Sequence, residues 1–143
     1  MLEKAFLDKA RYYLVKWGCQ PAGRPFYTHS SLLWPVKKEG HAFILKIVDA
    51  DDEEANASIM LRAYEGHGAV ILEKEAENVY LIECVENGGT TLESLCEQGR
   101  DEEAVEIVCD VAQKILQQAE NLKSPDQLKH FSHRTEDMMN YLQ

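Results

Sequence analysis

The stretch Ala42-Phe43-Ile44-Leu45-Lys46-Ile47-Val48 decides how the rest of this sequence is interpreted. It is an apolar run with one lysine in it, and the acidic segment Asp51-Asp52-Glu53-Glu54 follows it closely. Apolar residues on both sides of Lys46 predict a strand in a covered sheet. A buried ammonium group needs an anionic partner, because desolvating it alone costs several kcal/mol. Glu54, on a predicted helix that continues through Tyr64, is the nearest candidate.

Two interpretations of Lys46 stay open at this point. In the first, the ammonium group pairs with Glu54 inside the fold. In the second, the lysine extends along the sheet until its ammonium group reaches water, beside an acidic helix that is itself solvated. Spacing alone favours the second interpretation, so the choice depends on the remainder of the chain.

Composition limits the class of protein and the class of partner. The chain has 143 residues, of which 45% are hydrophobic and 28% charged, which is typical of one globular domain with a real core. A net charge of -10 argues against nucleic acid or an anionic membrane surface as the main partner and favours a cationic ligand. No apolar stretch approaches the roughly 18 residues that a membrane span requires, and no signal peptide is evident, so we expect a cytoplasmic protein.

The cysteines and histidines predict neither a disulfide framework nor a metal site. The four cysteines include no C-x-x-C pair, and three of them lie in apolar patterns, which predicts buried, reduced thiols. His130 and His133 lie three residues apart on a predicted helix, but no third ligand has suitable spacing, so we interpret them as surface residues. Alternation of Glu73, Glu75 and Glu77 indicates a solvated strand edge.

The first half of the chain predicts an α+β fold. Helical spacing from Leu2 to Trp17, followed by Gly18, predicts an amphipathic helix. Short strands are predicted at 26–27, 32–36, 43–48, 69–72 and 79–85, with a turn at Lys38-Glu39-Gly40 making a hairpin of the second and third. We therefore expect an antiparallel sheet of about five strands, with the Glu54 helix inserted after the third.

The second half is predicted to be helical. Thr90 and Glu93 form an expected capping box for a short helix that Gly99 ends, and Ser124-Pro125 starts the last helix. Asp101 caps a longer helix with one apolar stripe, made of Val105, Val108, Val111, Ala112, Ile115, Leu116 and Ala119. The expected organisation is an N-terminal helix at 1–20, a small-lobe sheet with its helix at 21–88, and a helical connector with the start of a C-terminal lobe at 89–143.

Five segments follow one another in an order that is informative as a set. They are Ser30-Ser31-Leu32-Leu33-Trp34, Ile44-Leu45-Lys46, Glu54, Gly66-His67-Gly68-Ala69-Val70 and Leu81-Ile82-Glu83. In this order they resemble the aminoglycoside/hydroxyurea antibiotic resistance kinases, the streptomycin 6-phosphotransferase family. The resemblance runs from about Tyr27 to the helix after Asp101.

This resemblance implies a protein-kinase-like small lobe that binds ATP. Lys46 resembles the strand lysine that contacts the α- and β-phosphates, and Glu54 resembles its helix partner. A complete enzyme of this family would use Mg²⁺ and transfer the γ-phosphate of ATP to a hydroxyl of streptomycin or a similar polycationic acceptor. The acidic balance of the chain suits such an acceptor.

Two further groups of residues correspond to contacts of the nucleotide. The turn from Thr28 to Ser31 stands where the phosphates would be covered; it has no glycine-rich loop, so backbone N–H groups and the Ser30 and Ser31 hydroxyls would make the contacts. At the hinge after the fifth strand, the Glu83 carbonyl and the Val85 N–H would meet the adenine edge. A plain turn stays open as the alternative for Ser30 and Ser31.

The chemistry of this family resides in a loop of the type His-Gly-Asp-x-x-x-x-Asn, and these residues do not include one. His133-Arg134 with Asn140 has the outer spacing, but Thr135 stands where the catalytic aspartate should be, and a helical face runs through the segment. No catalytic residue is therefore assigned. Without a base and metal ligands the chain alone is expected to be inactive, and whether it is itself an enzyme is left open.

A second hypothesis belongs to a different class. The chain would be a non-catalytic pseudokinase relic whose sheet and helices serve as a protein-interaction or dimerisation module. An isolated small lobe would expose the apolar surface that normally meets a larger lobe, and another chain, either a partner protein or a second copy in a homodimer, would cover that surface.

Overall fold

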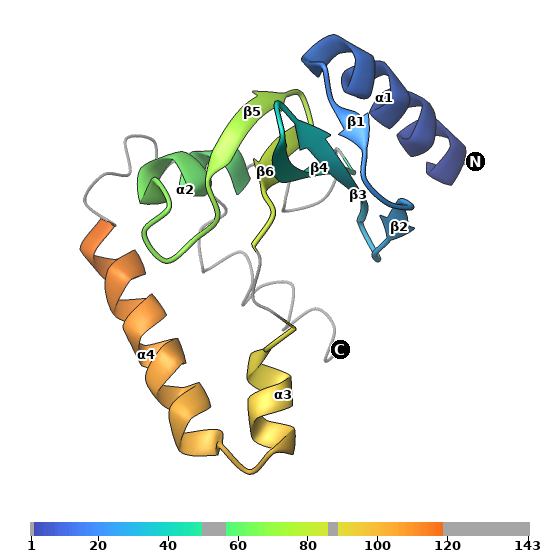
Figure 1. The fold of residues 1–143 in the computed structure, drawn as a ribbon. Helices are drawn as coiled ribbons and strands as arrows, with labels where there is room; N and C mark the ends of the chain where they lie inside the picture. The colour runs from blue at the N-terminus through green and yellow to red at the C-terminus, as the bar shows by residue number, and fades with distance from the viewer. Residues whose placement is uncertain (1, 50–56, 86–88, 119–143) are drawn as a thin grey trace, which may run out of the picture.

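The computed structural model describes residues 2–49, 57–85 and 89–118, and its architecture is α+β. A twisted antiparallel sheet carries helix α1 beside β3 and β4 and helix α2 beside β5, and helices α3 and α4 follow (Figure 1). The predicted class, an antiparallel sheet with an inserted helix and a helical segment after it, is confirmed.

Helix α1 (Leu2–Trp17) ends as its sequence predicts. Gly18 adopts a left-handed conformation, with φ of 67°. Its N–H donates to the Val15 carbonyl at 3.2 Å, and the Cys19 N–H donates to the Leu14 carbonyl at 2.8 Å. These two bonds satisfy carbonyls that the end of a helix otherwise leaves without partners.

The sheet has six strands, all paired antiparallel, in the order β1-β3-β4-β6-β5, with β2 also pairing β3. The strands are β1 (Gln20–Pro21), β2 (Phe26–Tyr27), β3 (Ser31–Lys38), β4 (His41–Val48), β5 (Leu72–Ala76) and β6 (Val79–Glu83). The predicted hairpin joins β3 and β4. Glu39 and Gly40 both have positive φ, 51° and 83°, which matches the right-handed twist of the two strands.

The two faces of the sheet are used differently. One face, together with α1, forms the core, which is made of Ala10, Leu14, Cys19, Leu32, Val36, Leu45, Ile47, Val79 and Leu81. Because side chains alternate along a strand, Lys46 lies on the other face. We call that second face the lysine face; it carries Leu33, Pro35, Ile44, Lys46, Tyr80 and Ile82.

Helix α2 (Ala57–Tyr64) is held over the β5 side of the sheet. Arg62 forms an ion pair with Glu75 of β5, and Glu75 is paired in register with Tyr80 on the lysine face. The beginning of the predicted helix, including Glu54, lies outside the described residues.

Strand β5 corrects one prediction. The sequence predicts a strand at 69–72, whereas the strand spans Leu72–Ala76 and its turn follows at Glu77 and Asn78. The strand is at the edge of the sheet, so it alternates half-buried and exposed residues instead of forming a continuous apolar run.

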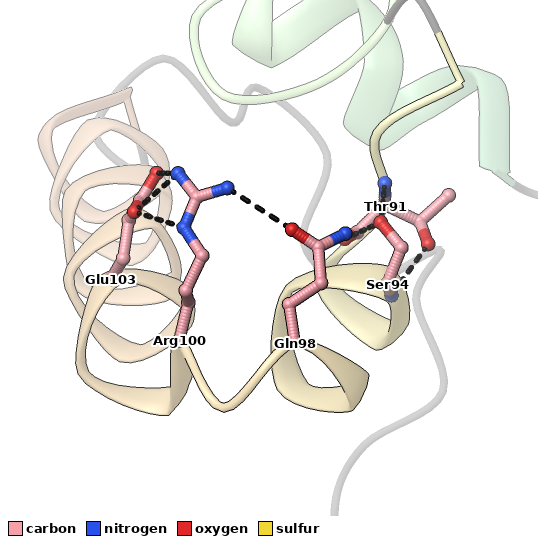
Figure 2. A network of polar contacts seen from close by, with 5 residues as sticks. All are labelled: Thr91, Ser94, Gln98, Arg100 and Glu103. Atoms are coloured by element: carbon pink, nitrogen blue, oxygen red, sulfur yellow. Dashed lines mark hydrogen bonds and ion pairs between the residues drawn. The ribbon is translucent and has the colours of Figure 1, made fainter.

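Helices α3 (Leu92–Glu97) and α4 (Asp101–Gln118) are joined by a short polar connection (Figure 2). The N-cap of α3 is Thr91, with Ser94 as its partner, so the predicted capping box at Thr90 and Glu93 is wrong by one residue at the cap. The Thr91 hydroxyl accepts from the Ser94 N–H at 3.1 Å, and the Ser94 hydroxyl accepts from the Thr91 N–H at 2.8 Å. Serine, a short hydroxyl donor and acceptor, therefore does what glutamate was expected to do.

On the α4 side of this connection, Arg100 holds the carboxylate of Glu103 with two nitrogens, at 2.7–2.9 Å. The same guanidinium donates to the Gln98 side chain at the end of α3, at 3.3 Å. Figure 2 shows Arg100 between the two helices. Charge-assisted hydrogen bonds thus connect the end of α3 to the first turn of α4.

The apolar stripe predicted on α4 is only partly buried. Val111 and Ile115 are half-buried, and the buried residue of the helix is Ala104. Val105, Val108 and Leu116 are 60%, 50% and 72% exposed. The last predicted helix, at 124–143, lies outside the described residues.

All four cysteines are free thiols. Cys19 is buried in the core, and this burial raises the pKa of its thiol, against the lowering effect of Lys38 and Lys74. Cys96 and Cys109 are exposed, so the prediction of buried thiols is wrong for these two residues, which lie on the open sides of α3 and α4.

Candidate functional site

Lys46 lies in the middle of a row of side chains that crosses the sheet. The register pairs Lys46 of β4 with Leu33 of β3 and with Tyr80 of β6. Leu33 is paired in turn with Phe26, and Tyr80 with Glu75. Residues paired across antiparallel strands project to the same face, so all five share the lysine face.

Apolar side chains on the lysine face are partly open to solvent. Leu33, Pro35, Ile44 and Ile82 are all half-buried, so the platform is open on the β3 side and toward the end of β6. Tyr80, beside Lys46 on β6, and Val48, at the end of β4, are 3% and 2% exposed. The opposite face of the sheet is closed by α1. Lys46, also half-buried, therefore lies beside an accessible apolar platform, the combination that a ligand with an anionic part and an apolar ring would use.

The turn before β3 is fixed by hydrogen bonds of Thr28 and Ser31. The Thr28 N–H donates to the Ser31 carbonyl at 2.8 Å, the two hydroxyls lie 2.7 Å apart, and the Ser31 N–H donates to the Thr28 hydroxyl at 3.1 Å. Ser31 is 2% exposed. Ser30 is half-buried, and its carbonyl accepts from the Asp49 N–H at 3.0 Å. The two serines predicted to contact phosphate thus lie at the start of the strand that borders Lys46, and the Ser31 hydroxyl is engaged within the turn.

At the other end of the site, the backbone groups of Glu83, Cys84 and Val85 point alternately away from β4 and toward it. The Cys84 N–H donates to the Ala42 carbonyl at 3.4 Å, so Cys84 faces β4. In an antiparallel ladder the groups of successive residues point to alternate sides, which directs the Glu83 carbonyl and the Val85 N–H away from β4. Consistently, the Glu83 N–H donates to the Ile71 carbonyl at 2.9 Å, on the β5 side.

The Glu83 side chain also contacts this segment. Its Oε2 accepts from the Ile71 N–H at 3.2 Å, so Glu83 bonds Ile71 through both its backbone and its carboxylate. Val85 is 62% exposed. The predicted hinge is therefore anchored on both sides, by β4 through Cys84 and by Ile71 through Glu83, with an exposed residue after it.

Some predicted site residues are brought together and one is not described. The Thr28–Ser31 turn leads into β3, whose Leu33 is paired with Lys46, so the turn and the lysine lie at the same apolar platform. Ile82 of β6 also belongs to this platform, and Glu83 follows it directly in the chain. Glu54 lies outside the described residues, so its pairing with Lys46 stays a prediction. The sequence reasoning did not identify Phe26, although the period-two pairing of β2 with β3 places it in the lysine row.

Within the described ranges, no group of three or more His, Cys, Asp or Glu side chains gathers as a set of metal ligands. In those same ranges, no helix combines the length and the apolar character needed to cross a membrane.

An antiparallel sheet with a lysine on its middle strand and a helix over the β5 side, followed by helices, is the architecture of the small lobe of a kinase-like fold. The chain belongs to the aminoglycoside/hydroxyurea antibiotic resistance kinase family, whose model matches residues 16–140. The match includes α4 and the strands that carry the predicted site, and it begins earlier than the resemblance seen from motifs alone.

The chain is also similar to a curated protein, streptomycin 3″-kinase of Klebsiella pneumoniae. The two are 31% identical over 102 residues, a segment that covers 71% of this chain and 38% of that kinase. The chain thus spans well under half of the length of this relative. No solved structure matches the chain significantly. Neither match favours the hypothesis of a non-catalytic interaction module.

Proposed function

We infer that this chain is the nucleotide-binding lobe of an aminoglycoside kinase, in which Lys46 contacts the α- and β-phosphates of ATP. The observation that carries this proposal is the position of Lys46 on the open face of the sheet, beside half-buried apolar residues. An ammonium group there offers charge to phosphates while the platform offers apolar surface to the base. The family match and the similarity to streptomycin 3″-kinase support the same assignment.

In this proposal the other predicted residues have distinct roles. Backbone N–H groups of the Thr28–Ser31 turn and the Ser30 hydroxyl would cover the phosphates, with Ser31 shaping the turn through its bonds to Thr28. The Glu83 carbonyl and Val85 N–H would accept and donate at the adenine edge. Glu54 would orient Lys46. The division of the chain into segments at 1–20, 21–88 and 89–143 also remains a proposal. The first two segments share one hydrophobic core, because residues of α1 pack with residues of the sheet.

The reaction of the whole protein follows from the same assignment. An acceptor hydroxyl would bond to the γ-phosphorus, the bond from that phosphorus to the bridging oxygen would break, and ADP would leave while the hydroxyl proton passes to a base. Mg²⁺ would neutralise charge on the phosphates. The net charge of -10 suits an acceptor that carries several positive charges, such as an aminoglycoside. That these residues alone transfer no phosphate stays a prediction.

The experiment is calorimetric titration of the chain with ATP, compared between two lysine variants. Lys46→Met keeps the length of the side chain but removes the charge, and we expect ATP affinity to fall about tenfold or more, which corresponds to about 1.4 kcal/mol. Lys74→Met is the matched control, because Lys74 is a half-buried strand lysine paired with Leu81 on the opposite face. Its affinity should match that of the unmodified chain. Absence of ATP binding, or equal losses in the two variants, would overturn the proposal.

A further inference from the structure

The hydrogen bonds between β6 and the residue before β5 depart from a regular ladder at one pair, Ile71 and Glu83. Leu72 and Ile82 are paired in register, so Ile71 lies opposite Glu83. In an antiparallel ladder a hydrogen-bonded pair exchanges two bonds, each from an N–H to the carbonyl of the other residue. The Glu83 N–H donates to the Ile71 carbonyl at 2.9 Å, as the ladder requires. The Ile71 N–H instead donates to the Glu83 side chain, 3.2 Å from Oε2.

The Glu83 carboxylate therefore takes the place that a regular ladder gives to the carbonyl of the same residue. A backbone N–H needs one acceptor, and the carboxylate is that acceptor for Ile71. The bond that would occupy the Glu83 carbonyl from the β5 side is thus replaced. This carbonyl is the group that the proposed function directs at the adenine edge.

The local structure keeps this end of the ladder irregular and open. The register shifts between Leu72 and Lys74, directly after Ile71, and such irregularities disrupt ladder bonding locally. Ile71 is 50% exposed, and Glu83 is also exposed. A ligand can therefore reach the backbone at this position.

The carboxylate itself projects from the face of the sheet opposite the platform. Glu83 is paired with Phe43, which packs against the core under α1, whereas the preceding residue, Ile82, lies on the lysine face. The negative charge of Glu83 is thus kept away from the side on which Lys46 would hold phosphates. Any effect of this side chain on a nucleotide must pass through the backbone that it fixes.

We propose that Glu83 is a positioning residue of the nucleotide site, whose carboxylate engages the Ile71 N–H and so keeps the Glu83 carbonyl available to the exocyclic amino group of adenine. This inference rests on the proposed function. Without the carboxylate, the Ile71 N–H would turn to the carbonyl, because an N–H group without an acceptor is costly. The base would then compete with Ile71 for one oxygen. The carboxylate thereby supports selectivity for a base that carries an amino group.

Four substitutions separate the reach of the side chain from its charge. Glu83→Gln keeps the length and an acceptor oxygen without the charge, and Glu83→Asp keeps the charge but is shorter by one methylene. Glu83→Ala removes both properties. Glu77→Ala is the control, because Glu77 is an exposed glutamate in the turn between β5 and β6. Its bond from Lys9 is accepted by the backbone carbonyl, which alanine retains.

The test is calorimetric titration of each variant with ATP, with purine riboside triphosphate, whose base lacks the amino group, and with inorganic tripolyphosphate. We expect Glu83→Ala and Glu83→Asp to bind ATP about five- to tenfold more weakly, the size of one hydrogen bond. Glu83→Gln and Glu77→Ala should bind ATP like the unmodified chain. The preference of the unmodified chain for ATP over purine riboside triphosphate should largely disappear in Glu83→Ala. Tripolyphosphate binding should stay unchanged in all four variants.

The outcomes separate the inference from the function on which it rests. No ATP binding by the unmodified chain would overturn the proposed function itself. Normal ATP binding with no preference for the amino group, or with a preference that Glu83→Ala leaves intact, would overturn the role of Glu83 alone. Equal losses for the two nucleotides would do the same, because a merely structural defect does not distinguish them.

Two variants keep the test decisive. If Glu83→Ala fails to fold, Glu83→Asp is judged by the same comparison of the two nucleotides. A loss of ATP affinity in Glu83→Gln as large as that in Glu83→Asp would contradict the proposal, because glutamine retains the acceptor for the Ile71 N–H.

Discussion

Ser31 shows how one hydroxyl fixes the edge of the candidate site. The side chain is almost completely buried and lies 2.7 Å from the Thr28 hydroxyl, and the Ser31 N–H donates to that same oxygen. In a buried site a polar group without its partner costs the full desolvation penalty. The shape of the turn that would cover phosphates therefore depends on the hydroxyls of Thr28 and Ser31. A glycine-rich loop would instead take its shape from the conformational freedom of glycine.

Replacing Ser31 should cost stability, and replacing its neighbour should not. Ser31→Ala removes one hydroxyl of the hydrogen-bonded pair at an almost completely buried position, while the Thr28 hydroxyl keeps its bond to the Ser31 N–H. We therefore expect the free energy of unfolding to fall by about 1 kcal/mol, the net contribution of one hydrogen bond. Ser30→Ala is the control, because Ser30 bonds Asp49 through its carbonyl, which alanine retains. Urea denaturation of the two variants measures the difference. Equal stability of the two would show that the Ser31 hydroxyl does not hold the turn.

At the scale of elements, the contact between the loop after α2 and helix α4 depends on Gly68. Its φ is 82°, and an added Cβ would lie 3.0 Å from both the Val111 carbonyl oxygen and the Ile115 Cγ1. Only glycine combines this backbone conformation with such a close approach. Gly68, the second glycine of the Gly66-His67-Gly68 segment, thus allows α4 to lie against the loop after α2.

Alanine at Gly68 should therefore be more damaging than alanine at Gly99. Gly99 also has positive φ, 71°, but a Cβ there would meet nothing within 4 Å, so only backbone strain of about 1 kcal/mol is expected. Gly68→Ala adds steric overlap with α4, and we expect a loss of about 2 kcal/mol or more. Thermal unfolding followed by circular dichroism compares the two. A cost at Gly68 no larger than at Gly99 would mean that α4 is not packed against this loop.

The elements also show what the sequence could predict. The α1 helix with its Gly18 cap, the β3-β4 hairpin and the strand with Lys46 were all predictable, because their local signals agree with their burial. The sequence predicts β5 too early in the chain, at 69–72 instead of Leu72–Ala76, because an edge strand lacks the continuous apolar run expected of a strand covered on both faces. The place of Phe26 in the same row of side chains as Lys46, with Leu33 between them, is not predictable from the sequence, because it depends on the pairing of a two-residue strand.

For the whole molecule, the apolar stripe of α4 is the largest departure from what patterning predicts. Val105, Val108 and Leu116 are among the most exposed hydrophobic residues of the described chain. Helical periodicity indicates that an apolar face exists, but it does not say what covers that face. The side of α4 that lies against the loop after α2 is marked instead by the close approach of Val111 and Ile115 to Gly68, and both residues are half-buried.

The sequence analysis predicts a homodimer through the exposed face of the lobe, and we extend this prediction to the exposed stripe of α4, where it can be tested directly. If a second copy covers the stripe, sedimentation velocity should show a mass that rises with concentration, and Leu116→Glu, at a position 72% exposed, should abolish the rise. Glu106→Gln, on an exposed polar position of the same helix, serves as the control. A monomer at every concentration would contradict association.

The central claim is that the lysine face, and not the face under α1, binds nucleotide. The most direct measurement is a titration of the isotope-labelled chain with ATP, followed by amide chemical shifts. We expect saturable shifts at Leu33, Lys46, Ile82 and Val85, with small changes at Leu14 and other residues of α1 that form the core. Shifts restricted to α1 and its side of the sheet, or no saturable shifts at all, would contradict the account.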